Sequence, residues 1–457
     1  MQHKLDFYKR MLSLAIPIAM QQLLTSCAAM IDTAMVVGLG NISTAAIGVA
    51  VRWTFILNIA LFGVSSGVAT ITAQYWGMND LKNIRRTYGT GLACALPIGI
   101  LFALCTRLIP REMMTVFTRE EPVIQQGILY LQNVSLYGVF FSLVQVLSTS
   151  MRTTENVRIP LLCAIVSVLS NTFLNYLLIG GHLGFPALGL RGAALATTIA
   201  TFIQMALLLI LGRAKKEIVC SHYREIFGLN RQFVRSYLLI SIPVLINELG
   251  WGIGTNVYSM VFARQGSDNY AAYTIFNSFD QVLFSFFVGI CSACSIMLGK
   301  SVGAGKPEEA YHMGKRFIGL IIAMGLGIGA AFLALRYPLL GLMPIETEQV
   351  RQTAARIMAV YALWLPIRNI PYICIVGIFR AGGDTKTGMY LDISALFLIS
   401  IPTVYVLGFY TDIAFPALVA AMYVAEDSLK VTLCLIHFFR RKWIRKITVD
   451  KSAALTK

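Results

Sequence analysis

The chain has 457 residues, of which 57% are hydrophobic and 13% are charged, and its mean hydropathy is +0.69. Soluble domains carry roughly 25% charged residues, so this composition excludes a soluble globular protein and predicts a membrane-spanning one. The net charge of +16 does not indicate nucleic-acid binding, because the basic residues lie in loops and tails rather than in one patch interleaved with aromatic residues.

Apolar runs of about 20 or more residues predict twelve membrane-spanning helices. In the first half of the chain they cover residues 11–39, 46–74, 87–107, 123–149, 159–180 and 187–212. In the second half they cover residues 236–263, 270–298, 314–336, 352–379, 387–410 and 413–439. The predicted fold class is therefore an all-α membrane protein.

The distribution of basic residues predicts the orientation of these helices. The N-terminus, the loops after the even-numbered spans and the C-terminal tail hold 27 of the 38 Lys and Arg residues, and the opposite loops hold eight. Cytoplasmic segments keep the positive charge, so we expect both termini in the cytoplasm and the protein in the plasma (inner) membrane.

The two halves of the sequence resemble each other. Pro17 aligns with Pro243 at an offset of 226 residues, and Arg152 aligns with Arg380 at an offset of 228. Because each half has six spans, both halves enter the membrane in the same orientation, as two pseudo-symmetric six-helix bundles. The predicted limits are 1–212 for the N-terminal lobe, 213–235 for a cytoplasmic connector, 236–439 for the C-terminal lobe and 440–457 for a basic cytoplasmic tail.

Four segments carry a resemblance to a known family: IPIAMQQLLTSCAAMIDTAMVVGLG, MRTTENVRIP, GLRGAALAT and FRAGGDTK. The order and spacing of these segments resemble those of the MATE (multidrug and toxic compound extrusion) transporters, and the resemblance covers nearly the whole chain. The resemblance implies a V-shaped pair of six-helix lobes, alternating access, and export of organic cations and other amphiphiles in exchange for H⁺ or Na⁺. The segment GKSVGAGKP fails the phosphate-loop pattern, so transport is expected to be secondary.

Asp32 is the first candidate for ion coupling. It lies about 10 Å from the outer end of the first span, and an ionisable group at that depth is usually functional. Asn171 and Asn175 share one helix face at i,i+4 spacing and lie at nearly the same depth. The resemblance implies that these residues gather with a helix-6 partner, for which Thr197 is the candidate. Asp32 is read as a proton acceptor or a Na⁺ ligand, with a buried carboxylate satisfied by hydroxyl groups as the structural alternative.

A second candidate site lies in the C-terminal half. Glu248 stands in the seventh span, where its repeat counterpart is Gln22. The resemblance implies a cation site with a helix-7 Glu and a helix-10 acid, but that acid maps onto Asn369. Asp280 is the candidate to replace that missing acid, and Na⁺ is a candidate ion to bind at Glu248. A pairing of Arg368 with Glu248 or Asp280 would instead close this lobe by a salt bridge.

Other charges within the spans are read as structural. Glu426 and Lys430 are four residues apart on one helix and can neutralise each other. Asp392 lies near the expected cytoplasmic interface and is given no role. Cys291 and Cys294 lie in mid-helix without a second pair or a His partner, so they predict helix packing rather than metal binding.

The favoured function is a secondary antiporter that exports amphiphilic, cationic organic compounds in exchange for H⁺ or Na⁺. A flippase for lipid-linked saccharides, from the same superfamily, is the alternative, although the deep charges lean acidic. A membrane enzyme is a third possibility, but no catalytic cluster is recognisable and none is predicted. The expected partners are small amphiphiles, the coupling ion and the bilayer, with no cofactor, no nucleic acid and a monomeric state.

Overall fold

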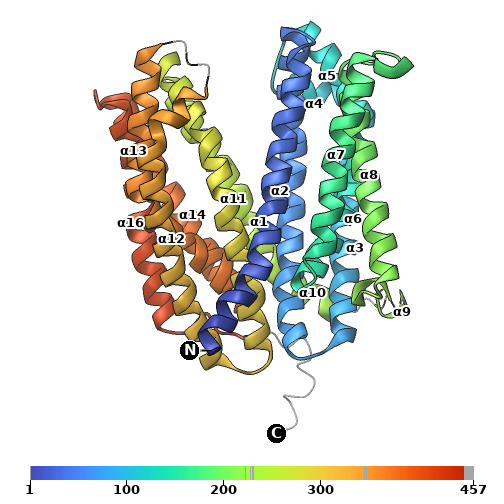
Figure 1. The fold of residues 1–457 in the computed structure, drawn as a ribbon, viewed down its shortest axis with the longest axis vertical. Coiled ribbons are helices and arrows are strands. Elements are labelled where there is room, and N and C mark those ends of the chain that lie inside the picture. The colour runs from blue at the N-terminus through green and yellow to red at the C-terminus, as the bar shows by residue number, and fades with distance from the viewer. Residues whose placement is uncertain are drawn as a thin grey trace. The chain divides into compact units, whose positions relative to one another are not determined.

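The computed structural model describes residues 2–221, 223–226, 228, 231–343, 345 and 347–446, and these residues are helical almost throughout (Figure 1). Parts of the predicted connector 213–235 and tail 440–457 lie outside the described residues. Backbone contacts divide the chain into two compact units. The N-unit comprises residues 16–245, and the C-unit comprises residues 1–15 and 246–457. The predicted domain limits stay a prediction.

The N-unit contains α1 from Ile16 onward, the other helices of the first half and α10 up to Leu245. The elements are α1 (Gln2–Val37), α2 (Asn41–Gly77), α3 (Leu81–Leu108), α4 (Pro110–Thr115), α5 (Glu121–Val134), α6 (Tyr137–Thr153), α7 (Arg158–Gly180), the short η1 (His182–Gly184), α8 (Leu190–Ala214), η2 (Ile218–Cys220), α9 (Tyr223–Ile226) and α10 (Arg231–Ala263). Within this unit α7 packs along α8, and α3 packs against both α2 and α6. This unit contains α7, α8 and the part of α1 from Ile16 onward, the three helices with polar candidates.

The C-unit contains the first part of α1, α10 from Ile246 onward and the remaining elements. They are α11 (Ser267–Gly303), α12 (Pro307–Gly341), α13 (Glu348–Tyr372), η3 (Ile373–Phe379), α14 (Thr385–Ser394), η4 (Ala395–Ser400), α15 (Ile401–Tyr410) and α16 (Phe415–Phe439). The helix α12 packs along α13, and α16 packs against α13 and η4. These contacts place α16 against two of the C-unit's other membrane-spanning segments.

The described helices fit a membrane by length and composition. Ten are long and apolar enough to cross it, and α5 with α6 forms an eleventh span with a bend of 50° between its parts. The twelfth, α16, is long enough but carries Glu426, Asp427 and Lys430 near its middle. Every window of 18 residues within α16 includes these three charges. The helix α16 therefore differs from the other spans in its charges and not in its length.

Three predicted spans are interrupted in the structure. The expected span 123–149 is divided between α5 and α6, and the division lets α6 approach α3 so closely that a Cβ on Gly99 would lie 2.4 Å from the Gly138 carbonyl oxygen. The spans 352–379 and 387–410 contain the π-helical segments η3 and η4. Pro371 precedes η3 and Pro402 follows η4, and each lacks the N–H that a regular helix needs there.

Small residues set the packing of α12 on α13. A Cβ on Gly325 would lie 2.6 Å from Pro366 Cα, and one on Gly329 would lie 2.5 Å from the Ala362 carbonyl oxygen. Glycines at i,i+4 spacing allow two membrane helices to approach at backbone distance. Gly327 stands between these two glycines in the sequence, but it is exposed, and a Cβ on it would have no neighbouring atom within 4 Å.

Replacing Gly325 by alanine is therefore expected to destabilise the protein by about 1–3 kcal/mol, the usual cost of overpacking. The same change at Gly327 is the matched control, and it should be neutral or stabilising by up to about 1 kcal/mol because alanine favours the helix. Unfolding of both variants in detergent micelles measures the difference. Equal stabilities would contradict the close approach of α12 and α13.

Candidate functional site

The four polar candidates of the N-unit form one hydrogen-bonded chain. The Asn175 side chain on α7 donates from Nδ2 to Asp32 Oδ1 on α1 at 2.5 Å and to Asn171 Oδ1 at 3.3 Å. Asn171 Nδ2 donates in turn to Thr197 Oγ1 on α8 at 3.4 Å. The structure thus brings together all four residues that sequence reasoning selected, and we call them the Asp32 cluster. Their functional role stays a prediction.

The Asp32 cluster is buried on the α7 side and rich in oxygen atoms. Asn171 and Asn175 are 6% and 0% exposed, and Asp32 is partly exposed. Asn175 uses its amide hydrogens on two acceptors, which leaves its Oδ1 atom buried without a hydrogen-bond partner among the described residues. This arrangement matches an ionised Asp32, because the amide donates to the carboxylate. The cluster can accept a proton at Asp32, or it can offer oxygen atoms to a hard cation.

The corresponding candidates of the C-unit do not gather in the same way. Glu248 Oε1 on α10 forms an ion pair with Arg380 Nη2 at 2.7 Å, so the proposed pairing of Glu248 with Arg368 is wrong. Arg380 directly follows η3, and this position brings its side chain to α10. Arg368 instead lies over the Tyr423 ring, with Cζ 4.5 Å from the ring centre. A carboxylate already bound to a guanidinium is a weaker candidate for Na⁺.

The other two C-unit candidates are buried at separate contacts. Asn369 is 4% exposed and donates from Nδ2 to the Leu365 carbonyl oxygen of its own helix at 3.0 Å. Asp280 on α11 hydrogen-bonds with Tyr361 and interacts electrostatically with Arg368. Its Oδ1 atom is buried without a hydrogen-bond partner in the described parts of the chain. Asp280 and Arg368 thus share one environment, whereas Glu248 and Asn369 have other partners.

The aligned arginines contact the first helix of their own half, although their partners are one residue apart in the repeat alignment. Arg380 binds Glu248 on α10, and Arg152 Nη1 donates to Gln21 Oε1 on α1 at 3.2 Å. Arg152 lies in the last turn of α6 and Arg380 directly follows η3, and each reaches the first helix of its half. The sequence offset predicted the equivalence of the arginines but did not identify their partners.

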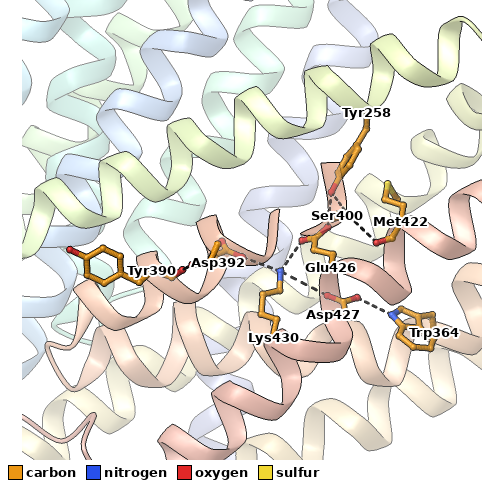
Figure 2. Close-up of polar contacts among 10 residues, drawn as sticks. Tyr258, Trp364, Tyr390, Asp392, Ser400, Met422, Glu426, Asp427 and Lys430 are labelled. Atoms are coloured by element: carbon orange, nitrogen blue, oxygen red, sulfur yellow. Dashed lines mark hydrogen bonds and ion pairs between the residues drawn. The ribbon is translucent and has the colours of Figure 1, made fainter. Parts of the chain in front are cut away.

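A polar cluster that the sequence did not predict as a whole lies in the C-unit. Lys430 Nζ is 2.7 Å from Glu426 Oε1, 3.0 Å from Asp392 Oδ1 and 3.9 Å from Asp427 Oδ1 (Figure 2). The predicted pairing of Glu426 with Lys430 is confirmed. Asp392, which was given no role, also binds Lys430. We call Asp392, Glu426, Asp427 and Lys430 the Lys430 cluster.

Tyrosine, serine and tryptophan side chains extend this cluster to neighbouring helices (Figure 2). Trp364 Nε1 on α13 donates to Asp427 Oδ2 at 2.9 Å. The Tyr258 hydroxyl on α10 lies 2.6 Å from Ser400 Oγ and 3.5 Å from Glu426 Oε2. Among the described residues, no group of three or more His, Cys, Asp or Glu side chains has a geometry that could hold a metal ion.

Comparison with known proteins places this chain in a family. The sequence model of the MatE family matches residues 17–177 and 243–406. The two matched segments begin 226 residues apart, at Pro17 and Pro243, which is the offset of the internal repeat. The family model therefore matches both halves and covers most of the chain.

Curated relatives match over nearly the full length. The chain is 22% identical to the probable multidrug resistance protein NorM of Thermotoga maritima, over 99% of this chain and 95% of that protein. It is 26% identical to the multidrug resistance protein NorM of Burkholderia vietnamiensis, over 88% of this chain and 87% of that protein. These matches leave no large part of the chain outside the relationship.

Solved structures share the fold at low sequence identity. A MATE protein in the bent conformation superposes with a TM-score of 0.87 at 16% identity, over 98% of this chain and 97% of that chain. A MOP superfamily transporter from Pyrococcus furiosus superposes with a TM-score of 0.86 at 16% identity, over 96% and 97%. The likeness confirms the predicted all-α, twelve-helix fold. With the family model matched across both halves, this chain belongs to the MATE family of membrane transporters.

Proposed function

We propose that this protein exports amphiphilic, cationic organic compounds from the cell in exchange for H⁺ or Na⁺. The names of the two NorM relatives support export of drug-like compounds. The excess of basic residues in alternate loops supports a plasma-membrane orientation with both termini in the cytoplasm. The protein works by alternating access and, on this proposal, as a monomer.

The Asp32 cluster is the observation that carries the proposal. A carboxylate within a membrane span is costly, and its retention there indicates a function. Asp32 has one strong hydrogen-bond donor, Asn175, and the described residues offer it no ion pair. A coupling ion that binds at Asp32 therefore neutralises a charge that the protein itself leaves uncompensated.

Neutralisation of Asp32 changes the contacts between α1 and α7. When Asp32 is ionised, the Asn175 amide donates a hydrogen bond to its carboxylate. When Asp32 is protonated, its carboxyl group becomes a hydrogen-bond donor. After rotation of the amide, it can donate to Asn175 Oδ1, which has no partner among the described residues. A Na⁺ ion would use the same oxygen atoms as ligands. Either event links ion binding to the packing of two helices of the N-unit.

Transport by purified protein in lipid vesicles tests the proposal. The vesicles are loaded with a fluorescent cationic dye and receive either a pH gradient or a Na⁺ gradient, each without the other. We expect one of the two gradients to drive dye against its concentration gradient. For one-to-one exchange, a tenfold ion gradient supplies about 1.4 kcal/mol, which supports an accumulation of about tenfold. Dye movement that follows neither gradient would contradict ion-coupled exchange.

A further inference from the structure

The chain folds back over the C-unit directly after α16. Trp443 is 0% exposed, and the Arg445 backbone N–H donates to the Gly382 carbonyl oxygen at 3.0 Å. The contact with Gly382 is close, since a Cβ on this glycine would lie 2.0 Å from the Trp443 carbonyl oxygen. We call residues 440–445 the strap and residues 380–384, between η3 and α14, the α14 loop. The strap thus lies directly against the α14 loop.

Two ion pairs add to this contact. Arg445 Nη2 lies 3.2 Å from Oδ1 of Asp384, the residue that precedes α14. Arg441 forms an ion pair with Glu308 in the first turn of α12, and its Cζ atom lies 4.0 Å from the centre of the Tyr311 ring. The strap therefore connects the end of α16 to the beginnings of α12 and α14.

The internal repeat contains a similar contact in the N-unit. The offset of 228 residues that aligns the two arginines also aligns Asn156 with Asp384 and Glu217 with Arg445. Asn156 Nδ2 donates to Glu217 Oε1, so the segment after α8 binds the loop after α6. The side chains differ between the halves, an amide with a carboxylate in one and a carboxylate with a guanidinium in the other. The contact between segment and loop recurs, whereas its chemistry does not.

The contact of the N-unit is held more firmly than that of the C-unit. After Glu217 the segment continues into η2, where Arg85 on α3 donates to the Ile218 carbonyl oxygen at 3.1 Å. In the strap, by contrast, the Arg445 side chain is 55% exposed and that of Arg441 is 45% exposed. Exposed ion pairs contribute little to stability, so docking of the strap depends mainly on the burial of Trp443.

Release of the strap would not leave a buried charge without partners. The Asp384 side chain is 0% exposed, and its Oδ2 atom lies 2.8 Å from His437 Nε2 on α16. The Thr387 hydroxyl on α14 donates to Asp384 Oδ1 at 2.9 Å. Both groups lie outside the strap, so Asp384 keeps two hydrogen-bond partners when Arg445 leaves. The large penalty for breaking a buried ion pair is therefore avoided.

We propose that the strap is a reversible latch on the C-unit, which restrains α14 while it is docked and releases it by local opening. The α14 loop begins at Arg380, which binds Glu248 on α10, and the π-helical η3 and η4 lie on either side of the loop and α14. Such irregular segments can absorb a change in the position of α14 once the strap has left. The docked strap then slows the helix movements that transport requires, a consequence that rests on the proposed function.

Hydrogen–deuterium exchange of the full-length protein in lipid vesicles tests the latch without a transport assay. Gly382→Ala is the main variant, because Gly382 does not have a positive φ and the three nearest atoms that a Cβ would meet all belong to Trp443. We expect the Arg445 amide, the α14 loop and the first turns of α14 to exchange at least about tenfold faster than in the unsubstituted protein, because local opening is favoured. Peptides of α13 should keep their protection.

Two further variants complete the exchange experiment. Trp443→Ala removes the other partner of the contact and should reproduce the effect of Gly382→Ala. Gly319→Ala on α12 is the matched control, since a Cβ there would have no atom within 4 Å, and its protection should equal that of the unsubstituted protein. Unchanged protection of the α14 loop in both test variants would overturn the proposal. Loss of protection throughout the C-unit would also overturn it, because the strap would then be part of the core rather than a latch.

The initial rate of dye export tests the restraint on transport. With the strap released, Gly382→Ala and Trp443→Ala should export dye about two- to fivefold faster than Gly319→Ala, as expected where a conformational step limits turnover. Rates equal to or below that of Gly319→Ala would contradict the restraint. Absence of gradient-driven transport in the unsubstituted protein would contradict the proposed function, and the exchange result would still decide whether the strap is a latch.

Discussion

Replacing Asp32 by asparagine is expected to abolish ion-coupled efflux while leaving the fold intact. Asparagine has nearly the same size as aspartate and keeps a side-chain oxygen that accepts the hydrogen bond from Asn175. It has no negative charge, so it cannot take up a proton or neutralise a bound Na⁺. With a tenfold ion gradient across a lipid vesicle, accumulation of a cationic dye should fall from about tenfold to no accumulation, since about 1.4 kcal/mol of driving force is lost.

The control for Asp32→Asn is Glu120→Gln, which replaces a carboxylate by an amide at an exposed loop residue. Both variants should reconstitute in equal amounts and retain the helical circular-dichroism spectrum. Dye binding measured at equilibrium, without a gradient, separates loss of coupling from loss of substrate binding. Accumulation by Asp32→Asn equal to that by Glu120→Gln would show that coupling does not depend on the Asp32 cluster.

The second large effect concerns the stability of the C-unit. Replacing Lys430 by methionine keeps the length of the side chain but leaves Asp392, Glu426 and Asp427 without their shared cation. Loss of one partner of a buried ion pair costs about 3–5 kcal/mol, because the remaining charge is uncompensated. We expect a loss of stability of this size at neutral pH and a smaller loss at acidic pH, where protonation removes the orphaned charges.

The controls for Lys430→Met are chosen to separate charge from packing. Lys442→Met makes the same change at an exposed residue after α16, and it should alter stability by no more than about 0.5 kcal/mol. The double variant Lys430→Met, Glu426→Gln removes one of the orphaned charges and should recover part of the loss. Unfolding in mixed detergent micelles measures all three. A Lys430→Met variant as stable as Lys442→Met would contradict a central role of the ammonium group.

Hydropathy and helical periodicity account for much of what the sequence predicted. The limits of the spans follow from apolar length, and i,i+4 spacing correctly placed Asn171 beside Asn175 and Glu426 beside Lys430. Both are properties of a single helix. The gathering of Asp32 with the α7 and α8 side chains was implied by family resemblance, and the structure contains that contact.

The contacts that the sequence did not predict join residues on different helices. Glu248 and Arg380 are 132 residues apart, and Asp392 and Lys430 are 38 residues apart. Their meeting depends on the rotation of each helix about its own axis, which local periodicity does not determine. The division at α5 and α6 was also missed, because no proline stands between those helices and the apolar character continues through the bend.

The bend between α5 and α6 has a consequence for the tolerance of the N-unit to substitution. A break inside a membrane leaves backbone carbonyl groups that need donors from elsewhere in the protein. The Thr198 hydroxyl lies 3.2 Å from the Asn133 carbonyl oxygen near the end of α5 and 2.9 Å from the Ala194 carbonyl oxygen of its own helix, so its single proton is shared between the bend and α8. Thr198 is the immediate neighbour of Thr197 in the Asp32 cluster, so a donor at the bend and a member of that cluster share one turn of α8. Substitution of either threonine is therefore expected to affect both the bend and the Asp32 cluster, so this turn tolerates few substitutions.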